Sequence, residues 1–269
     1  MVDSSRTSAC FQKLEAEHRN WLSAFDAGYL RNWESLLNDR EEAAFAEAGV
    51  RRLLQEHCIT VEPNEDLANS EKRPDFRCFA GRYEFYVEVT NISIDSATQT
   101  TGIPHQGSIE AHPFSISPRR IFWKTVNKEA QCDGVDAPAL VAVTTFHGFA
   151  AKLWCTRIFM NWLLIGETKL ARPIDVRTGN RVGDACQVTE LKSAPFLDEA
   201  SEDWFARESI SGLLVCHPAM NDLPILGGLH PKPVRPFDPA ILPQVEFGQL
   251  TIDRTSGKLT VVWPEEKGE

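Results

Sequence analysis

Several features of membrane and secreted proteins are missing from the sequence. No uninterrupted apolar stretch approaches the roughly 20 residues that a membrane helix needs. The first residues, Met1 to Arg6, do not form the basic-then-apolar pattern of a secretory signal. None of the seven cysteines forms a C-x-x-C pair, which argues against zinc ribbons, disulfide scaffolds and haem attachment. We therefore expect a cytoplasmic protein with reduced thiols and no membrane contact.

An excess of positive charge is also missing. The chain carries 28 basic and 38 acidic residues, which gives a net charge of −10. Because affinity for a phosphate backbone comes from Lys and Arg, the protein is a poor general coat for nucleic acid. An enzyme that acts on nucleic acid needs only a local basic cleft, so that class stays open. No Walker motif, dinucleotide glycine motif or nucleophile elbow is present.

What is present is the composition of an ordinary globular protein with a sizeable core. Hydrophobic residues make up 42% and charged residues 25% of the 269 residues, and no repeat or linker divides the chain. We expect one α/β domain over residues 1–269. Its parts are an N-terminal helical region 1–38, a core of about 40–146 and a β-rich C-terminal elaboration 147–269.

The N-terminal part of the chain has helical periodicity followed by a short strand. Apolar residues at helical spacing predict helix over the first forty residues, interrupted near Gly28. Asn38 and Asp39 each have a glutamate three residues later, which is the spacing of a capping box. A second helix is therefore predicted to begin at Asn38 or Asp39 and to run to about His57. A strand at 59–61 follows it.

The segment 74–90 is the most informative in the chain. Aromatic and β-branched residues flank the dipeptide Gly81-Arg82, which suits the two-residue type II′ turn of a β-hairpin. With this turn, the numbers of directly opposed residues add up to 163, so Asp75 lies opposite Glu88 on one face. The Cβ atoms of the two acids are then about 5 Å apart.

Two opposed carboxylates are unfavourable unless a positive charge lies between them, because each raises the pKa of the other. A divalent cation resolves this conflict, and Mg²⁺ prefers carboxylate and carbonyl oxygens with several waters retained. The backbone carbonyl of Val89 is a third oxygen available there. The alternative is that either acid faces solvent or pairs with Arg73, Arg77 or Arg82.

The rest of the chain alternates between loops, helices and strands. A serine N-cap before a proline at the first helical position is a strong helix start, and a continuous apolar run is typical of a buried strand. The further predicted elements are a polar loop at 93–116, a helix from Ser117-Pro118 to before Gly134, a buried strand at 139–146, a helix at 151–165, and β-structure at 173–188, at 210–216 and around Ser256-Gly257.

The order of the elements over about residues 40–146 is itself a pattern. A helix and a short strand precede Pro74-Asp75 and the hairpin; Glu88-Val89-Thr90, a helix with Lys128 and Gln131, and a buried strand follow. This order resembles the restriction-endonuclease-like PD-(D/E)XK nuclease superfamily. The resemblance implies a mixed β-sheet flanked by helices, with Asp75 and Glu88 as ligands of Mg²⁺ or Mn²⁺.

The resemblance also implies an acid from the preceding helix. Glu47 is our choice as a third metal ligand, because it lies seven residues before Leu54 on the same side of the helix. Glu42 is the other candidate.

The family's lysine, two residues after the second acid, is replaced here by Thr90. Some members of the superfamily carry this lysine elsewhere. Lys124, Lys128 and Gln131 fall at i, i+4 and i+7 on the predicted helix, which makes one stripe, and similar nucleases have the K-x-x-Q spacing of Lys128 and Gln131 on this helix. The predicted catalytic residues are Asp75, Glu88, Lys128 and Gln131. The alternative for the stripe is an ordinary solvated helix face.

The function that the resemblance implies is metal-dependent hydrolysis of phosphodiester bonds in nucleic acid. The basic cluster Arg119, Arg120 and Lys124 is where a phosphate backbone is expected, with weak and salt-dependent affinity. A second hypothesis is a catalytically inactive nuclease-fold protein kept for binding or regulation, which Thr90 and the acidic charge favour. A third is an unrelated α/β protein with a coincidental hairpin.

Overall fold

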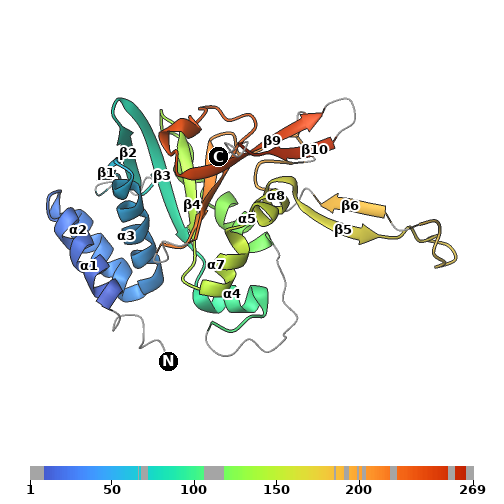
Figure 1. The fold of residues 1–269 in the computed structure, drawn as a ribbon, viewed down its shortest axis with the longest axis horizontal. Helices are drawn as coiled ribbons and strands as arrows, with labels where there is room; N and C mark the ends of the chain where they lie inside the picture. Colours follow the sequence, from blue (N-terminus) through green and yellow to red (C-terminus); the bar gives the residue numbers. More distant parts are fainter. Residues whose placement is uncertain are drawn as a thin grey trace, which may run out of the picture.

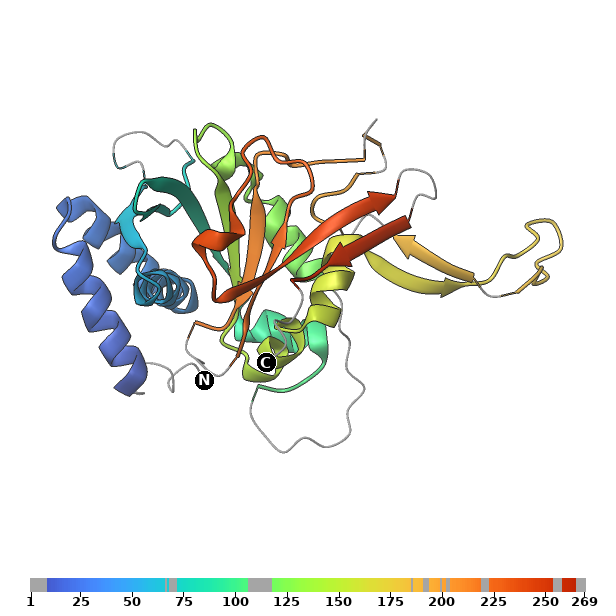
Figure 2. The same ribbon diagram turned by 45° about the horizontal axis from the view of Figure 1, so that its top comes forward.

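The central feature of the computed structural model is a large mixed β-sheet with helices on both faces (Figure 1, Figure 2). The described residues are 9–65, 67, 72–105, 118–184, 186–190, 194–198, 200–201, 204–218, 223–253 and 258–264. Among them, no helix is long and apolar enough to cross a membrane.

Eight strands of the described chain form this sheet, in the order β1-β2-β3-β4-β7-β8-β9-β10. The strands are β1 (Thr60–Pro63), β2 (Phe76–Ala80), β3 (Tyr83–Asn91), β4 (Ala139–Thr144), β7 (Gly212–Cys216), β8 (Ile225–Leu229), β9 (Val245–Asp253) and β10 (Lys258–Val262). β3, β4 and β7 are parallel, as are β8 and β9, and the other neighbouring strands are antiparallel. The chain is therefore an α/β protein with a mixed sheet flanked by helices.

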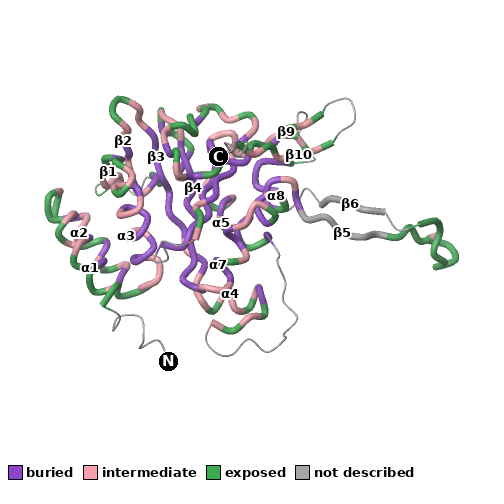
Figure 3. Tube along the Cα trace, in the orientation of Figure 1, coloured by how far each residue is buried: buried purple, intermediate pink, exposed green. Residues whose placement is uncertain are grey.

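The helices divide between the two faces of the sheet. They are α1 (Ala9–Leu22), α2 (Ala27–Asp39), α3 (Glu41–Glu56), α4 (Ile94–Thr101), α5 (Arg119–Val126), α6 (Glu129–Cys132), α7 (Gly148–Trp154) and α8 (Arg157–Ile165), with a 3₁₀ helix at Pro239–Ile241. Val87 and Leu140 belong to the core under α1 to α3, whereas Val141 and Val143 belong to the core under α5, α7 and α8. The central strands are thus buried on both faces, as Figure 3 shows.

The predicted hairpin is confirmed, with its register. β2 and β3 pair antiparallel from Phe76 opposite Val87 to Ala80 opposite Tyr83, so each pair adds up to the expected 163. Gly81 has φ +61°, a left-handed conformation that glycine adopts without strain. The predicted buried strand is also confirmed, because all six residues of β4 are buried.

The predicted start of the second helix is wrong. The helical structure is interrupted at residues 23–26. Gly28 lies inside α2, where its N–H donates to the side chain of the N-cap residue Asp26 at 2.7 Å. Asn38 and Asp39 belong to the last turn of α2, and α3 begins only at Glu41, with no side-chain cap. The capping-box spacing therefore coincides with a helix end, which the spacing alone does not distinguish from a helix start.

Three further predicted boundaries are corrected. Part of the expected polar loop is α4, because the Ser93 hydroxyl accepts from the Ser96 N–H and Gly102 ends the helix at φ +74°. The helix expected up to Gly134 is split into α5 and α6; Ser117 lies outside the described residues. The helix expected at 151–165 is split into α7 and α8, because Thr156 caps a new helix by accepting from the Phe159 N–H.

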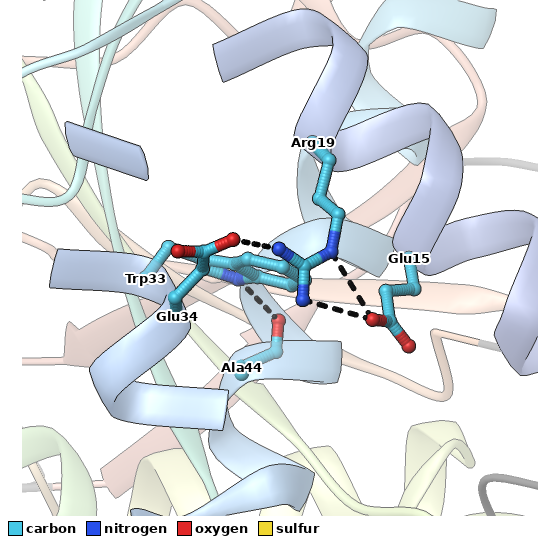
Figure 4. A network of polar contacts seen from close by, with 5 residues as sticks. All are labelled: Glu15, Arg19, Trp33, Glu34 and Ala44. Carbon is cyan, nitrogen blue, oxygen red and sulfur yellow. Dashed lines mark hydrogen bonds and ion pairs between the residues drawn. The ribbon is translucent and has the colours of Figure 1, made fainter. Parts of the chain in front are cut away.

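Polar contacts hold the three N-terminal helices together (Figure 4). On α1, Arg19 contacts Glu15 at 3.0 Å and also forms an ion pair with Glu34 of α2. The Trp33 Nε1–H of α2 donates to the Ala44 carbonyl of α3 at 3.1 Å. Because α3 carries Glu47, these contacts fix the position of an expected site residue.

The C-terminal part of the chain adds strands to the same sheet. β7 lies within the predicted 210–216 segment, and β9 and β10 pair antiparallel as the predicted final hairpin requires, although Ser256-Gly257 lies outside the described residues. β5 (Glu167–Ala171) and β6 (Cys186–Glu190) pair only with each other. Of the predicted 173–188 segment, only the end is strand.

Candidate functional site

Asp75 and Glu88 meet at the open end of the β2–β3 hairpin. The Asp75 N–H donates to Glu88 Oε2 at 3.2 Å, and Asp75 Oδ2 accepts from the Val89 N–H at 2.7 Å. Asp75 itself lies one residue before β2, so its carboxylate completes the pairing where the regular ladder stops. Glu88 is only 1% exposed. The hairpin register thus brings the two predicted acids together.

Lys128 contacts this pair of acids from a third part of the chain. It lies between α5 and α6, and its Nζ forms an ion pair with Glu88 Oε1. The predicted stripe with Lys124 does not lie on one continuous helix, because the break at 127–128 separates them. The Lys128 side chain nevertheless reaches the carboxylate of Glu88, one of the two predicted acids.

Burial is the largest influence on the ionisable groups of the site. Burial and the Glu88 carboxylate hold the pKa of Asp75 well above its usual value. Burial also raises the pKa of Glu88, although Lys128 opposes this rise. Burial alone lowers the pKa of Lys128, but Glu88 and Asp75 outweigh it, so the net shift is upward and the ammonium stays protonated.

The Glu47 carboxyl interacts electrostatically with the hairpin acids, whereas Glu42 interacts with other groups. Burial, then Asp75, Glu65 and Glu88, raise the pKa of Glu47 well above its usual value. Glu42 instead accepts from the Ile94 N–H at 2.9 Å, which caps α4. Of the two candidates from the preceding helix, the structure therefore sets Glu47 beside the hairpin acids.

Glu65 is a fourth carboxylate that the sequence reasoning missed. It lies after β1 and lines a small pocket together with Glu47 and Asp75; the pocket's other lining residues are His18, Trp21, Leu22, Tyr29, Trp33, Pro63 and Phe76. His18 is buried, and burial followed by Arg51 lowers its pKa to about 3, so the imidazole is neutral. One wall of the site is thus aromatic and uncharged.

The remaining predicted site residues lie close to Lys128. Gln131 is on α6, and its Oε1 is buried without a hydrogen-bond partner among the described residues. Thr90 follows Glu88 by two positions on β3, so both side chains point to the same face. Thr90 is 6% exposed. A side chain at this position is therefore directed along the same surface as Glu88.

The predicted basic cluster has an additional member. Burial and then Lys128, Arg40 and Arg120 lower the pKa of Lys124, which shows that these four cations share one region. Arg120 donates to Thr100 Oγ1 at 3.3 Å, and Arg119 is exposed on the same helix. Arg40, between α2 and α3, could not be assigned to this cluster from sequence spacing.

A divalent cation is chemically compatible with this site but has no preformed cage. Among the described residues, no group of three or more Asp, Glu, His or Cys side chains is arranged to hold a metal ion. The donors present are hard oxygens, and the carboxyl groups of Asp75, Glu47 and Glu88 share this region with the single ammonium of Lys128. Asp75 and Glu88 are the residues that could hold the ion, with Glu47 beside them.

The raised pKa of Glu47 predicts a pH-dependent effect of Glu47→Gln in metal-free buffer. A carboxyl whose pKa is raised by folding contributes its full stability below the unfolded pKa, and this is lost as pH rises through the folded pKa. We expect Glu47→Gln to raise the free energy of unfolding by about 1 kcal/mol at pH 8 and by less at pH 5. Urea titrations at both pH values measure this.

The matched control is Glu56→Gln, because Glu56 is exposed at the end of the same helix. Glu56 pairs only with Arg52 at the helix surface among the ion pairs of the described residues, and this variant is not expected to raise the free energy of unfolding at pH 8. A Glu47→Gln protein less stable than wild type at pH 8 contradicts the repulsion among the site carboxylates.

Comparison of the chain with family models, with curated proteins and with solved structures finds no match. The interpretation of the site therefore depends on its own geometry and charge.

Proposed function

We propose that the protein is a metal-dependent nuclease that hydrolyses phosphodiester bonds. The observation that carries the proposal is the convergence of Asp75, Glu88 and Lys128 at one end of the hairpin, from three separate elements. A buried acid, a half-buried acid and a lysine that pairs with one of them are the residue types that a metal-dependent phosphodiesterase requires. Glu47 adds a further acid.

The order of the elements supports the same proposal. α3, the antiparallel strands β1 to β3, the intervening helices and the parallel strand β4 follow one another as in the restriction-endonuclease-like superfamily. The finer assignment to that superfamily is part of the proposal.

Each residue has a role that its position allows. Asp75 and Glu88 would hold Mg²⁺ or Mn²⁺, which would polarise a phosphate oxygen and lower the pKa of a bound water. The Lys128 ammonium offsets negative charge that accumulates at the scissile phosphate. The Gln131 Oε1, which has no hydrogen-bond partner among the described residues, would accept a hydrogen bond from water, and the Nε2–H would donate to the nucleic-acid backbone. The cluster Arg40, Arg119, Arg120 and Lys124 receives the phosphates on either side.

A second candidate is a nuclease-fold protein without catalytic activity. Two observations favour it: Thr90 occupies the motif position of the lysine, and the Lys128 ammonium neutralises part of the Glu88 charge. In that case the basic cluster binds nucleic acid and the acids have no catalytic role.

Metal binding separates the two candidates. A calorimetric titration of the wild-type protein with Mn²⁺ is expected to give a binding isotherm, and labelled single- and double-stranded substrates are expected to be cleaved with Mn²⁺ but not with EDTA. A flat isotherm together with intact substrates rejects the nuclease and leaves the non-catalytic candidate.

A further inference from the structure

A two-stranded arm projects from the body of the protein. We define the arm as residues 167–190, which comprise β5, β6 and the tip 172–184 between them. In Figure 1 and Figure 2 the arm extends away from the main sheet, and in Figure 3 its tip is exposed. Its two strands pair only with each other, although β5 contacts α8, and the tip is largely exposed, so the arm needs an explanation other than stability of the core.

The tip has a defined conformation. Asp175 Oδ1 accepts from the Arg177 N–H at 2.8 Å, and the Asp175 N–H donates to the Asn180 carbonyl at 2.8 Å. The Val182 N–H donates to the Pro173 carbonyl at 2.9 Å, which continues the strand pairing toward the tip. These hydrogen bonds hold the backbone of the tip in a defined turn.

Those side chains are arginines interleaved with aliphatic residues. Val176 is 98% exposed, Ile174 60% and Val182 52%. Arg177 and Arg181 are exposed beside them, and no ion pair with a carboxylate is found for either within the described chain. The carboxylate of Asp175, by contrast, is engaged by the backbone of the turn. The tip carries Arg172, Arg177 and Arg181 against Asp175 and Asp184, so it combines a net charge of +1 with exposed apolar surface.

The length of the arm matters because the chain as a whole carries a net charge of −10. The eleven residues from Glu167 to Arg177 span at most about 35 Å at ~3.3 Å per residue. The Debye length at physiological salt is only about 8 Å, so the tip lies beyond most of the repulsion between the acidic body and a polyanion. A projecting arm is a way for an acidic protein to contact nucleic acid.

The shape of the arm favours B-form DNA among the polyanions. The major groove of B-form DNA is about 12 Å wide and admits a two-stranded β-ribbon, whereas the major groove of A-form RNA is too deep and narrow. Arginine contacts the flanking phosphates, and aliphatic side chains contact thymine methyl groups or base edges. The tip has both residue types.

The arm is also connected to the candidate site. α5, which carries Arg119, Arg120 and Lys124, packs against α8, and α8 leads directly into β5. In Figure 1, α5 lies between the central strands and the arm. A duplex held by the arm can therefore continue along α5 toward the hairpin acids.

We infer that the arm binds double-stranded DNA by entering the major groove of the duplex. Arg177 and Arg181 contact phosphates, and Val176 lies in the groove. This inference rests on the proposed function for the choice of nucleic acid as the partner and specifies its substrate class. It adds a contact surface outside the catalytic residues.

The test is fluorescence anisotropy with a labelled mixed-sequence DNA duplex in EDTA, where no cleavage interferes. Arg177→Ala/Arg181→Ala is expected to weaken duplex binding about tenfold and to reduce the slope of log affinity against log salt by about two. Arg31→Ala/Arg82→Ala removes the same charge from exposed positions on α2 and the hairpin turn, and is expected to bind as wild type does.

Three outcomes overturn the inference. The first is equal affinity and salt slope for wild type and the arm variant. The second is an equal loss with the control variant, or with an RNA duplex of the same sequence, because the groove then plays no part. The third is an arm-dependent self-association in sedimentation velocity without duplex binding, which assigns the tip to a second copy of this chain.

The duplex-binding and Mn²⁺ measurements together distinguish a failure of this inference from a failure of the proposed function. If arm-dependent duplex binding is found but Mn²⁺ gives neither binding nor cleavage, only the nuclease proposal fails. If the wild type cleaves nucleic acid with Mn²⁺ but the arm variant binds the duplex normally, only the arm inference fails.

Discussion

Glu88→Gln is expected to remove Mn²⁺ binding and to lower nuclease turnover by about a thousandfold or more. Glutamine keeps the shape of the side chain but carries no charge, so the cation loses one of its two main ligands. The amide also leaves the Lys128 ammonium without its carboxylate partner. Calorimetry with Mn²⁺ and a single-turnover cleavage assay measure the two effects, and both are expected to disappear together.

The matched control for this variant is Glu84→Gln. Glu84 lies on the same strand but at the closed end of the hairpin, where it pairs with Arg77 at 2.7 Å. It is expected to leave metal binding and turnover unchanged. A Glu88→Gln protein that is folded by circular dichroism and still binds Mn²⁺ at the wild-type affinity shows that the ion, if any, is held elsewhere.

The hairpin and its pair of acids could be predicted because the residues that determine them are close together in the sequence. A two-residue turn fixes the register, and the register fixes which side chains are opposed. The opposition of Asp75 and Glu88 then follows without knowledge of the rest of the fold. The all-apolar strand β4 was predictable for a similar reason, since a strand covered on both faces has a continuous apolar sequence.

The helix boundaries were less predictable because capping residues act through contacts that spacing does not reveal. The glutamate spacing after Asp39 indicated a start, but Glu42 is used to cap α4, more than fifty positions later. Ser93 and Thr156 begin helices inside segments that were assigned to a loop and to one continuous helix. In each case the side chain that ends or begins a helix is fixed by a hydrogen bond, which composition does not encode.

Some residues of the candidate site could likewise be predicted from the sequence, and others could not. Lys128 was predicted to contact the acids from a continuous helix, yet it does so from a break between α5 and α6. Glu65 and Arg40 were missed because each reaches the site through the packing of the N-terminal helices and β1. A carboxylate in a loop and an arginine between two helices have no sequence signal that separates them from solvated residues.

The last prediction concerns the position of the catalytic lysine. We expect Lys128→Ala to lower turnover about a hundredfold while Mn²⁺ binding is retained, because the ammonium offsets charge in the transition state but is not a metal ligand. Loss of the ammonium also raises the pKa of Glu88 further, since Lys128 opposes the effect of burial on that carboxyl. The acidic limb of the pH–rate profile is therefore expected to move to higher pH.

Thr90→Lys in the Lys128→Ala background tests whether one lysine can replace the other. Residue 90 lies two positions after Glu88 on the same face of β3, so the new ammonium can approach the carboxylate that Lys128 has left. We expect about a tenfold recovery of turnover and a return of the acidic limb toward its wild-type position. Lys152→Ala, exposed on α7, is the control and is expected to change neither. Full activity of Lys128→Ala alone contradicts the role of Lys128. Loss of Mn²⁺ binding in that variant shows instead that Lys128 maintains the metal site, and that its effect on turnover is indirect.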